Sequence, residues 1–128
     1  MKILVAYDGS DMAKKALALA QEHAKGFDAK IYVLHSLVTD IDQKQHQQDE
    51  RDMEDVKGLL ERGGFSFETH LTVRSMMPGE HLVEFAEENR IDEIILGLRK
   101  RSKVGKLILG STAQYVILNA PCPVVSVK

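Results

Sequence analysis

The feature that most constrains the fold is a regular alternation of short apolar runs with longer amphipathic segments. Apolar runs of strand length occupy residues 2–7, 29–37, 92–97 and 122–127. A fifth run, residues 65–73, alternates apolar and polar side chains, which is typical of a strand exposed on one face at a sheet edge. Strands that alternate with helices predict an α/β fold, an open parallel five-stranded sheet flanked by helices on both faces.

The segments between these runs carry helical signals. After Ser10, a candidate N-cap, alanines and a leucine recur on one helix face, and Gly26 is the predicted end of this helix. Residues 40–52 are polar, and the pattern leaves open whether they form a projecting helical arm or a loop. Pro78 opens a further helix, and apolar spacing predicts a last helix over about residues 109–119.

The length and net charge of the chain limit the kinds of protein that it can be. The 128 residues fit one domain, residues 1–128, and a net charge of −2 gives no global attraction to nucleic acid. The N-terminal apolar run ends in Asp8-Gly9 rather than a cleavage site, and no stretch reaches the roughly 20 apolar residues of a membrane span. A single cysteine, Cys122, cannot form an internal disulfide. These features predict a cytoplasmic protein with a buried thiol.

Two strand ends carry unusual residues. The first strand ends in "AYDGS" and the fourth is followed by "LGLRKRSKVGKLILGST", which holds three glycines and five basic side chains. Ligands of open parallel sheets bind beyond the carboxyl ends of the strands, where strand order reverses. If the first and fourth strands are neighbours, Asp8 and Gly97 lie side by side there.

The stretch Gly110-Ser111-Thr112 precedes a predicted helix. Free N–H groups and the positive end of the helix dipole favour an anion at such a position, and both hydroxyls can donate to phosphate oxygens. Two simpler interpretations stay open: Ser111 only caps this helix, and Asp8 only caps the first one.

These residues resemble the universal stress protein domain over essentially the whole chain. The resemblance rests on "ILVAYDGS", "VLHSL", "DEIILG", "LILGSTAQYVI" and "APCPVVSV". The nucleotide signature of that family, G-x2-G-x9-G-[S/T], maps onto Gly97, Lys100, Gly110 and Ser111. The resemblance implies an adenine nucleotide alpha hydrolase-like fold with strand order 3-2-1-4-5. It also implies a homodimer paired through the C-terminal strand, residues 122–127.

The resemblance further implies ATP or AMP as the ligand, and Mg²⁺ could accompany ATP. The residues expected to bind the nucleotide are Ala6, Tyr7, Asp8, Ser36, Leu96, Gly97, Arg99, Lys100, Gly110, Ser111 and Thr112. In the family, the position of Asp8 approaches the adenine or ribose, and the position of Ser36 lines the adenine pocket. The implied function is a dimeric nucleotide-binding module in stress or energy signalling.

Lys100 departs from the family signature, where a glycine stands. Glycine lets backbone approach phosphate closely, whereas lysine offers a mobile cation instead. The alternative function is therefore a nucleotide-free regulatory dimer that acts through protein partners. A slow ATPase or an autokinase that modifies Ser111 or Thr112 is a third hypothesis; no carboxylate pair or Walker-type lysine supports turnover.

Metal and nucleic-acid sites are not expected. The five histidines show no metal-ligand spacing, and with one cysteine a structural zinc site is not predicted. One of them, His35, is expected to be a packed or hydrogen-bonded core residue. The basic residues 99–106 lack interleaved aromatic side chains, so a nucleic-acid strand has no stacking platform.

Overall fold

Five parallel strands form one sheet in the order β3-β2-β1-β4-β5, which confirms the predicted fold class. The structure is a computed structural model in which residues 1–38, 42–98 and 109–128 are described. The strands are β1 (Lys2–Ala6), β2 (Lys30–Val38), β3 (Phe67–Arg74), β4 (Glu93–Gly97) and β5 (Val124–Val127). As the alternation at residues 65–73 predicted, β3 lies at a sheet edge.

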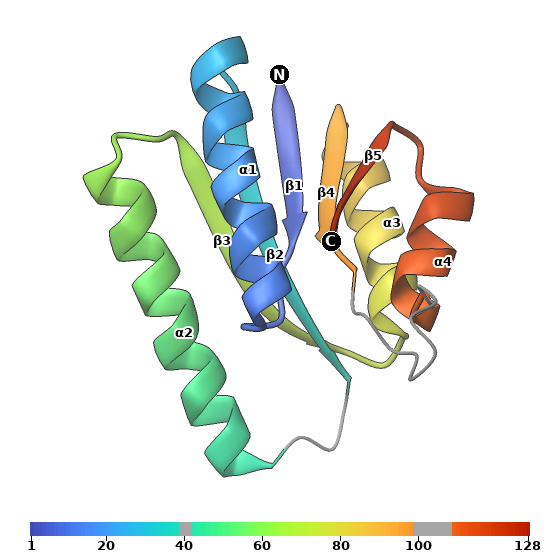
Figure 1. Cartoon of the computed structure of the whole chain (residues 1–128). Helices are drawn as coiled ribbons and strands as arrows, with labels where there is room; N and C mark the ends of the chain where they lie inside the picture. The colour runs from blue at the N-terminus through green and yellow to red at the C-terminus, as the bar shows by residue number, and fades with distance from the viewer. Residues whose placement is uncertain (39–41, 99–108) are drawn as a thin grey trace.

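Helices cover both faces of this sheet (Figure 1). Helices α1 (Asp11–Phe27) and α2 (Gln43–Arg62) pack on one face, and α3 (Pro78–Glu88) and α4 (Ser111–Asn119) on the other. Within the 40–52 segment, Asp42 is the N-cap of α2 and residues 43–52 are helical and belong to α2.

The central strand β1 divides the core between the two faces, because successive side chains of a strand point to opposite sides. Ile3 and Val5 pack with α1 and α2, and Leu4 packs with α3 and α4. All three side chains are fully buried. An apolar residue at every position is therefore what a strand covered on both faces requires.

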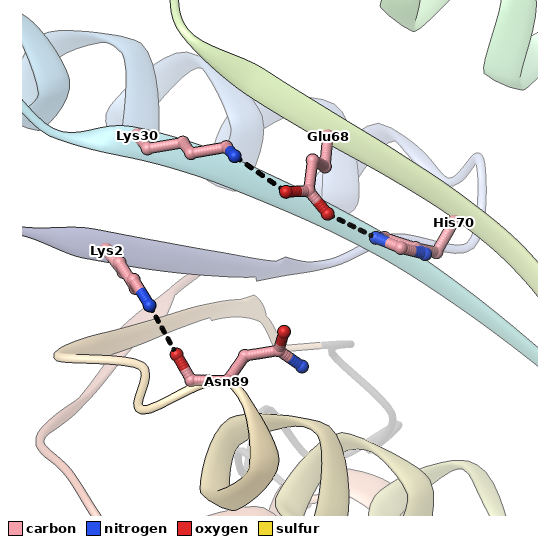
Figure 2. A network of polar contacts seen from close by, with 5 residues as sticks. All are labelled: Lys2, Lys30, Glu68, His70 and Asn89. Carbon is pink, nitrogen blue, oxygen red and sulfur yellow. Dashed lines mark hydrogen bonds and ion pairs between the residues drawn. The ribbon is translucent and has the colours of Figure 1, made fainter.

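The face that carries α3 and α4 becomes polar toward β3 (Figure 2). Lys30 Nζ lies 2.6 Å from a carboxylate oxygen of Glu68, whose other oxygen lies 3.1 Å from His70 Nε2. At the end of α3, Lys2 Nζ donates to the carbonyl of Asn89 at 2.9 Å, which ties β1 to the helix that follows β3 (Figure 2). The side chains of Lys30, Glu68 and His70 are partly exposed, and the polar residues of β3 on this face explain its alternating pattern.

Three local predictions were wrong. Helix α1 continues past Gly26, and Asp28 takes the left-handed conformation (φ 50°) that ends it; Asp tolerates that conformation through its short polar side chain. Strand β5 begins at Val124 rather than at residue 122, after a Pro123 that has no N–H to donate. The apolar spacing that predicts the last helix includes Ile117 as an inward-facing residue, but Ile117 is 43% exposed and only Ala113 and Val116 of α4 are buried.

Gly97 is required by packing rather than by a turn. A Cβ at this position would lie 2.6 Å from the carbonyl oxygen of Met12, in the first turn of α1. The absence of a side chain at the end of β4 therefore lets α1 begin directly against the sheet, beside the end of β1.

This close approach predicts opposite effects for two glycine substitutions. We expect Gly97→Ala to destabilise the protein by about 1–3 kcal/mol, because the backbone of α1 has to shift. Gly26→Ala is the matched control: it lies in a helix with nothing within 4 Å of the added Cβ, and we expect it to stabilise by about 0.5–1 kcal/mol. Urea unfolding measures both, and an unchanged midpoint for Gly97→Ala would show that α1 does not need this glycine.

Candidate functional site

A cavity of about 330 Å³ opens at the carboxyl ends of the strands, between β1, β4 and the start of α4. The predicted site residues that line it are Ala6, Tyr7, Asp8, Ser36, Leu96, Gly97, Gly110, Ser111 and Thr112. Strand β1 pairs with both β2 and β4, so three strand ends meet at this point. The cavity volume is at the lower end of the roughly 300–1,000 Å³ of small-ligand sites.

Two of the predicted site residues, Arg99 and Lys100, lie outside the described residues. The cavity is thus defined by the strand ends and by the start of α4.

Sequence reasoning missed part of the cavity wall. The additional lining residues are Ser10, Ala13, Leu34, His35, Pro78, Leu82 and Ala113. Pro78 and Leu82 come from the first turns of α3, and Leu34 and His35 precede Ser36 on β2. The proline that opens α3 marks a helix start at the carboxyl end of β3, which is the only sequence signal that pointed to this wall.

The start of α4 offers uncapped amide groups to the cavity. Its N-cap is Gly110, which makes no side-chain capping hydrogen bond, so the interpretation of Ser111 as a cap is wrong. Within the described part of the chain, the first α4 amide with a backbone partner is Gln114 N–H, which donates to the Gly110 carbonyl. The N–H groups of Ser111, Thr112 and Ala113 precede it, and they sit at the positive end of the helix dipole.

The loop between β1 and α1 forms the facing wall. Ser10 caps α1 by accepting the N–H of Ala13 at 3.2 Å, and Asp8 accepts the N–H of Ser10 at 3.0 Å. The interpretation of Asp8 as the α1 cap is therefore wrong, whereas that of Ser10 is confirmed. Gly9 has φ +80°, a conformation that favours glycine, and it turns the chain so that Asp8 lines the cavity.

Acidic side chains surround Tyr7 in the cavity wall. Burial raises the pKa of the Tyr7 hydroxyl, and the nearby carboxylates of Asp52, Asp8 and Asp55 raise it further. Among the described residues, the positive end of the α4 dipole and the carboxylates near Tyr7 belong to different walls of the cavity, so these walls favour different groups. An anion is stabilised at α4, and hydroxyl or N–H donors are favoured at Asp8.

Two buried histidines adjoin the β2 side of the cavity. His35 is 7% exposed, as predicted for a core residue, and it is one of the residues that line the cavity. Burial lowers its pKa, although Asp49, Asp8 and Asp52 act in the opposite direction. His81, on α3, is 3% exposed and its Nδ1 lies 2.6 Å from Ser36 Oγ.

The two ends of the cavity are well separated. Since neighbouring strands lie roughly 4.8 Å apart, the end of β2 is about 10 Å from the end of β4. Among the residues that the structure describes, no group of three acidic, histidine or cysteine side chains could hold a metal ion. No helix within these residues is both long and apolar enough to cross a membrane.

Comparison with known proteins gives a consistent result. A sequence model of the universal stress protein family matches residues 1–128. A universal stress protein of Thermus aquaticus is 35% identical over 98% of this chain and 97% of its own length.

Solved structures extend the comparison. A universal stress protein from Archaeoglobus fulgidus is 37% identical, with a TM-score of 0.88 over 100% of this chain and 98% of that one. A second, from the same organism and in complex with dAMP, is 31% identical with a TM-score of 0.82 and the same coverage.

The buried histidines predict how the fold responds to acid. Burial lowers the pKa of both His35 and His81 below the usual 6.5. The unfolded chain then binds more protons than the fold as pH drops. The contribution of these rings to stability is therefore complete above about pH 6.5 and is lost as pH falls below that value. Proton NMR of the two rings should show midpoints below 6.5, and urea unfolding should show a decline from pH 7 to 5. A midpoint at or above 6.5 for either ring contradicts this assignment.

Proposed function

The chain belongs to the universal stress protein family, and on that premise we propose that it is a dimeric module that binds ATP or AMP in the cavity at the ends of β1 and β4. The module reports the state of stress or energy supply through the bound nucleotide. This role belongs in the cytoplasm, the compartment in which those nucleotides change.

The observation that carries the proposal is the uncapped start of α4 in a cavity that also contains Asp8. A phosphate placed there accepts the first amides of α4 and the hydroxyls of Ser111 and Thr112. The structure of a relative from Archaeoglobus fulgidus in complex with dAMP, at 31% identity, supports a nucleotide as the occupant.

The polarity of the cavity orients this ligand. Asp8 repels phosphate and accepts hydrogen bonds from sugar hydroxyls, so the ribose lies against β1. The base then reaches the end of β2, where Leu34 and Leu82 supply apolar contacts. If Mg²⁺ accompanies ATP, the phosphates would supply its main ligands, because the described residues include no group of three acidic, histidine or cysteine side chains that could hold a metal ion.

We propose that the protein holds the nucleotide rather than hydrolysing it. The described residues that line the cavity include one carboxylate, Asp8, and no lysine, so they provide neither a carboxylate pair nor a Walker-type lysine for turnover.

Dimerisation is proposed through the open edge of β5. The carbonyl of Pro123 accepts the N–H of Ile94 in β4, and the carbonyl of Val127 accepts the N–H of Leu98, the residue that follows β4. Alternate residues of a strand face the same neighbour, so Val124 and Ser126 present their backbone groups to the free edge. An unpaired edge of this kind invites pairing with a second copy.

Exposed apolar side chains on the helix that precedes β5 support a second copy as the partner. Tyr115, Ile117 and Leu118 on α4, the helix that precedes β5, are exposed, and Leu118 is 80% exposed. Covering these side chains adds hydrophobic stabilisation to the strand pairing.

The nucleotide proposal is tested by titrating the nucleotide-stripped protein with AMP and with ATP in a calorimeter. We expect saturable binding of one nucleotide per chain. Gly110→Asp should reduce AMP affinity by about tenfold or more, because the new carboxylate accepts the α4 amides and repels phosphate. Its unfolding free energy should be unchanged or higher by a few tenths of a kcal/mol, since the substitution caps the helix.

Gly110→Asn is the matched control, because it can cap α4 without a charge; it should weaken AMP binding less. Equal AMP affinity in Gly110→Asp and the unmodified protein would place the phosphate elsewhere. A dimer that binds neither nucleotide would favour the nucleotide-free regulatory function instead.

The dimer proposal predicts a mass of twice 14.3 kDa by light scattering. Ser126→Pro should give a folded monomer, because proline removes a donor from the free edge while the bonds to β4 remain. Ser126→Ala keeps the donor and should stay dimeric. A Ser126→Pro protein that remains a dimer would contradict pairing through β5.

A further inference from the structure

The position of α4 depends mainly on its contact with α3. Helix α4 has nine residues, and of these only Ala113 and Val116 are buried. Both belong to the same hydrophobic cluster as the buried apolar side chains of α3, the element against which α4 packs most extensively. Helix α3 is anchored more firmly, because six of its eleven residues are buried and it contacts β2 as well as α4. The place of the α4 amides in the cavity therefore depends on how closely α4 approaches α3.

A glycine lies at the point where the two helices meet. Gly79 is buried in the first turn of α3. A Cβ at this position would lie 3.0 Å from Cβ of Tyr115 and 3.4 Å from the carbonyl oxygen of Thr112, both in α4. Gly79 is helical and is not among the glycines with positive φ, so its conformation would suit alanine at least as well. The close approach of α4, rather than the backbone conformation, is what requires glycine here.

A methyl group on residue 79 would displace α4 rather than a flexible side chain. Its nearest neighbour would be Cβ of Tyr115, which moves only with the backbone that carries it. Rotation of the Tyr115 ring leaves this contact in place, and the Thr112 carbonyl is itself backbone. Because packed interiors transmit strain and α4 is the less anchored helix, we expect its first turn to move by a few tenths of an ångström.

We propose that Gly79 is a positioning residue for the phosphate of the bound nucleotide. By letting α4 lie close against α3, it places the first amides of α4 where a phosphate can accept them. This inference rests on the proposed nucleotide function. Gly79 does not line the cavity, so its effect passes through α4. Since hydrogen bonds weaken with distance and misalignment, a small displacement of these amides weakens the hold on phosphate and leaves the contacts of the nucleoside with β1 and β2 intact.

The test compares the affinities of AMP and adenosine for the full chain at pH 7.5 by calorimetry. The two ligands share base and sugar, so the ratio of their affinities measures the contribution of the phosphate. In Gly79→Ala this ratio should fall about three- to tenfold, because the partial loss of a charge-assisted hydrogen bond costs roughly that factor. The affinity for adenosine should stay the same.

Gly26→Ala is the matched control. It adds the same methyl group to a helix, with nothing within 4 Å of the new Cβ, so the ratio should not change.

The double variant Gly79→Ala/Tyr115→Gly separates positioning from a general loss of stability. Tyr115→Gly removes the Cβ that the new methyl group meets, and Tyr115 does not line the cavity. The double variant should recover the ratio of the unmodified protein. It should nevertheless unfold at a lower urea concentration than Gly79→Ala, since glycine weakens the interior of α4. A double variant that keeps the low ratio would contradict the role of Gly79 as a spacer.

The remaining outcomes separate this inference from the function on which it rests. An unchanged ratio in Gly79→Ala overturns the inference alone. An equal fall in both affinities also overturns it, because α3 would then have moved with the lining residues Pro78 and Leu82. If Gly79→Ala does not fold, the double variant carries the test. Equal affinities of AMP and adenosine in the unmodified protein, or binding of neither, overturn the phosphate site and the inference with it.

Discussion

The position of β1 between β2 and β4 is the constraint on which the rest of the structure depends. Parallel pairing on both sides brings the ends of three strands to one edge of the sheet. Strand β1 can hold this position only because its residues are apolar on both faces, as Ile3, Leu4 and Val5 are. Gly97 then lets α1 begin against the end of β4, which brings the loop that carries Asp8 to the same place.

Two features determine which groups of a ligand each wall of the cavity favours. The start of α4 supplies amides and the positive end of a helix dipole, and the loop after β1 supplies a carboxylate. Neither feature is a site by itself, because helix starts and acidic loops are common. Their placement on opposite walls of one cavity of about 330 Å³ favours a ligand with an anionic end and a neutral, hydrogen-bonding body.

Much of this arrangement was predictable from the sequence. The alternation of apolar runs and helical patterns identified the sheet and its helices, and turn residues located Asp8 and Ser111. The wall formed by α3 was missed, because the contact between Ser36 and His81 joins residues that are 45 positions apart and no local pattern links them. The role of Gly97 could not be predicted from neighbouring residues. A glycine in a nucleotide signature suggests that the backbone approaches a ligand, whereas in the structure the backbone of α1 occupies the place that a Cβ of Gly97 would take. The end of α1 was misplaced because Asp28 substitutes for the expected glycine in a left-handed turn.

The central claim is that the first amides of α4 hold a phosphate group inside this cavity. The most direct measurement is an NMR titration of the ¹⁵N-labelled protein with AMP, followed at the backbone amides of Ser111, Thr112 and Ala113. The account predicts that these three resonances shift together and saturate at one AMP per chain, in step with resonances of the Asp8 loop. If AMP binds while the resonances of the α4 amides do not shift, or if no resonance shifts at all, the claim is wrong.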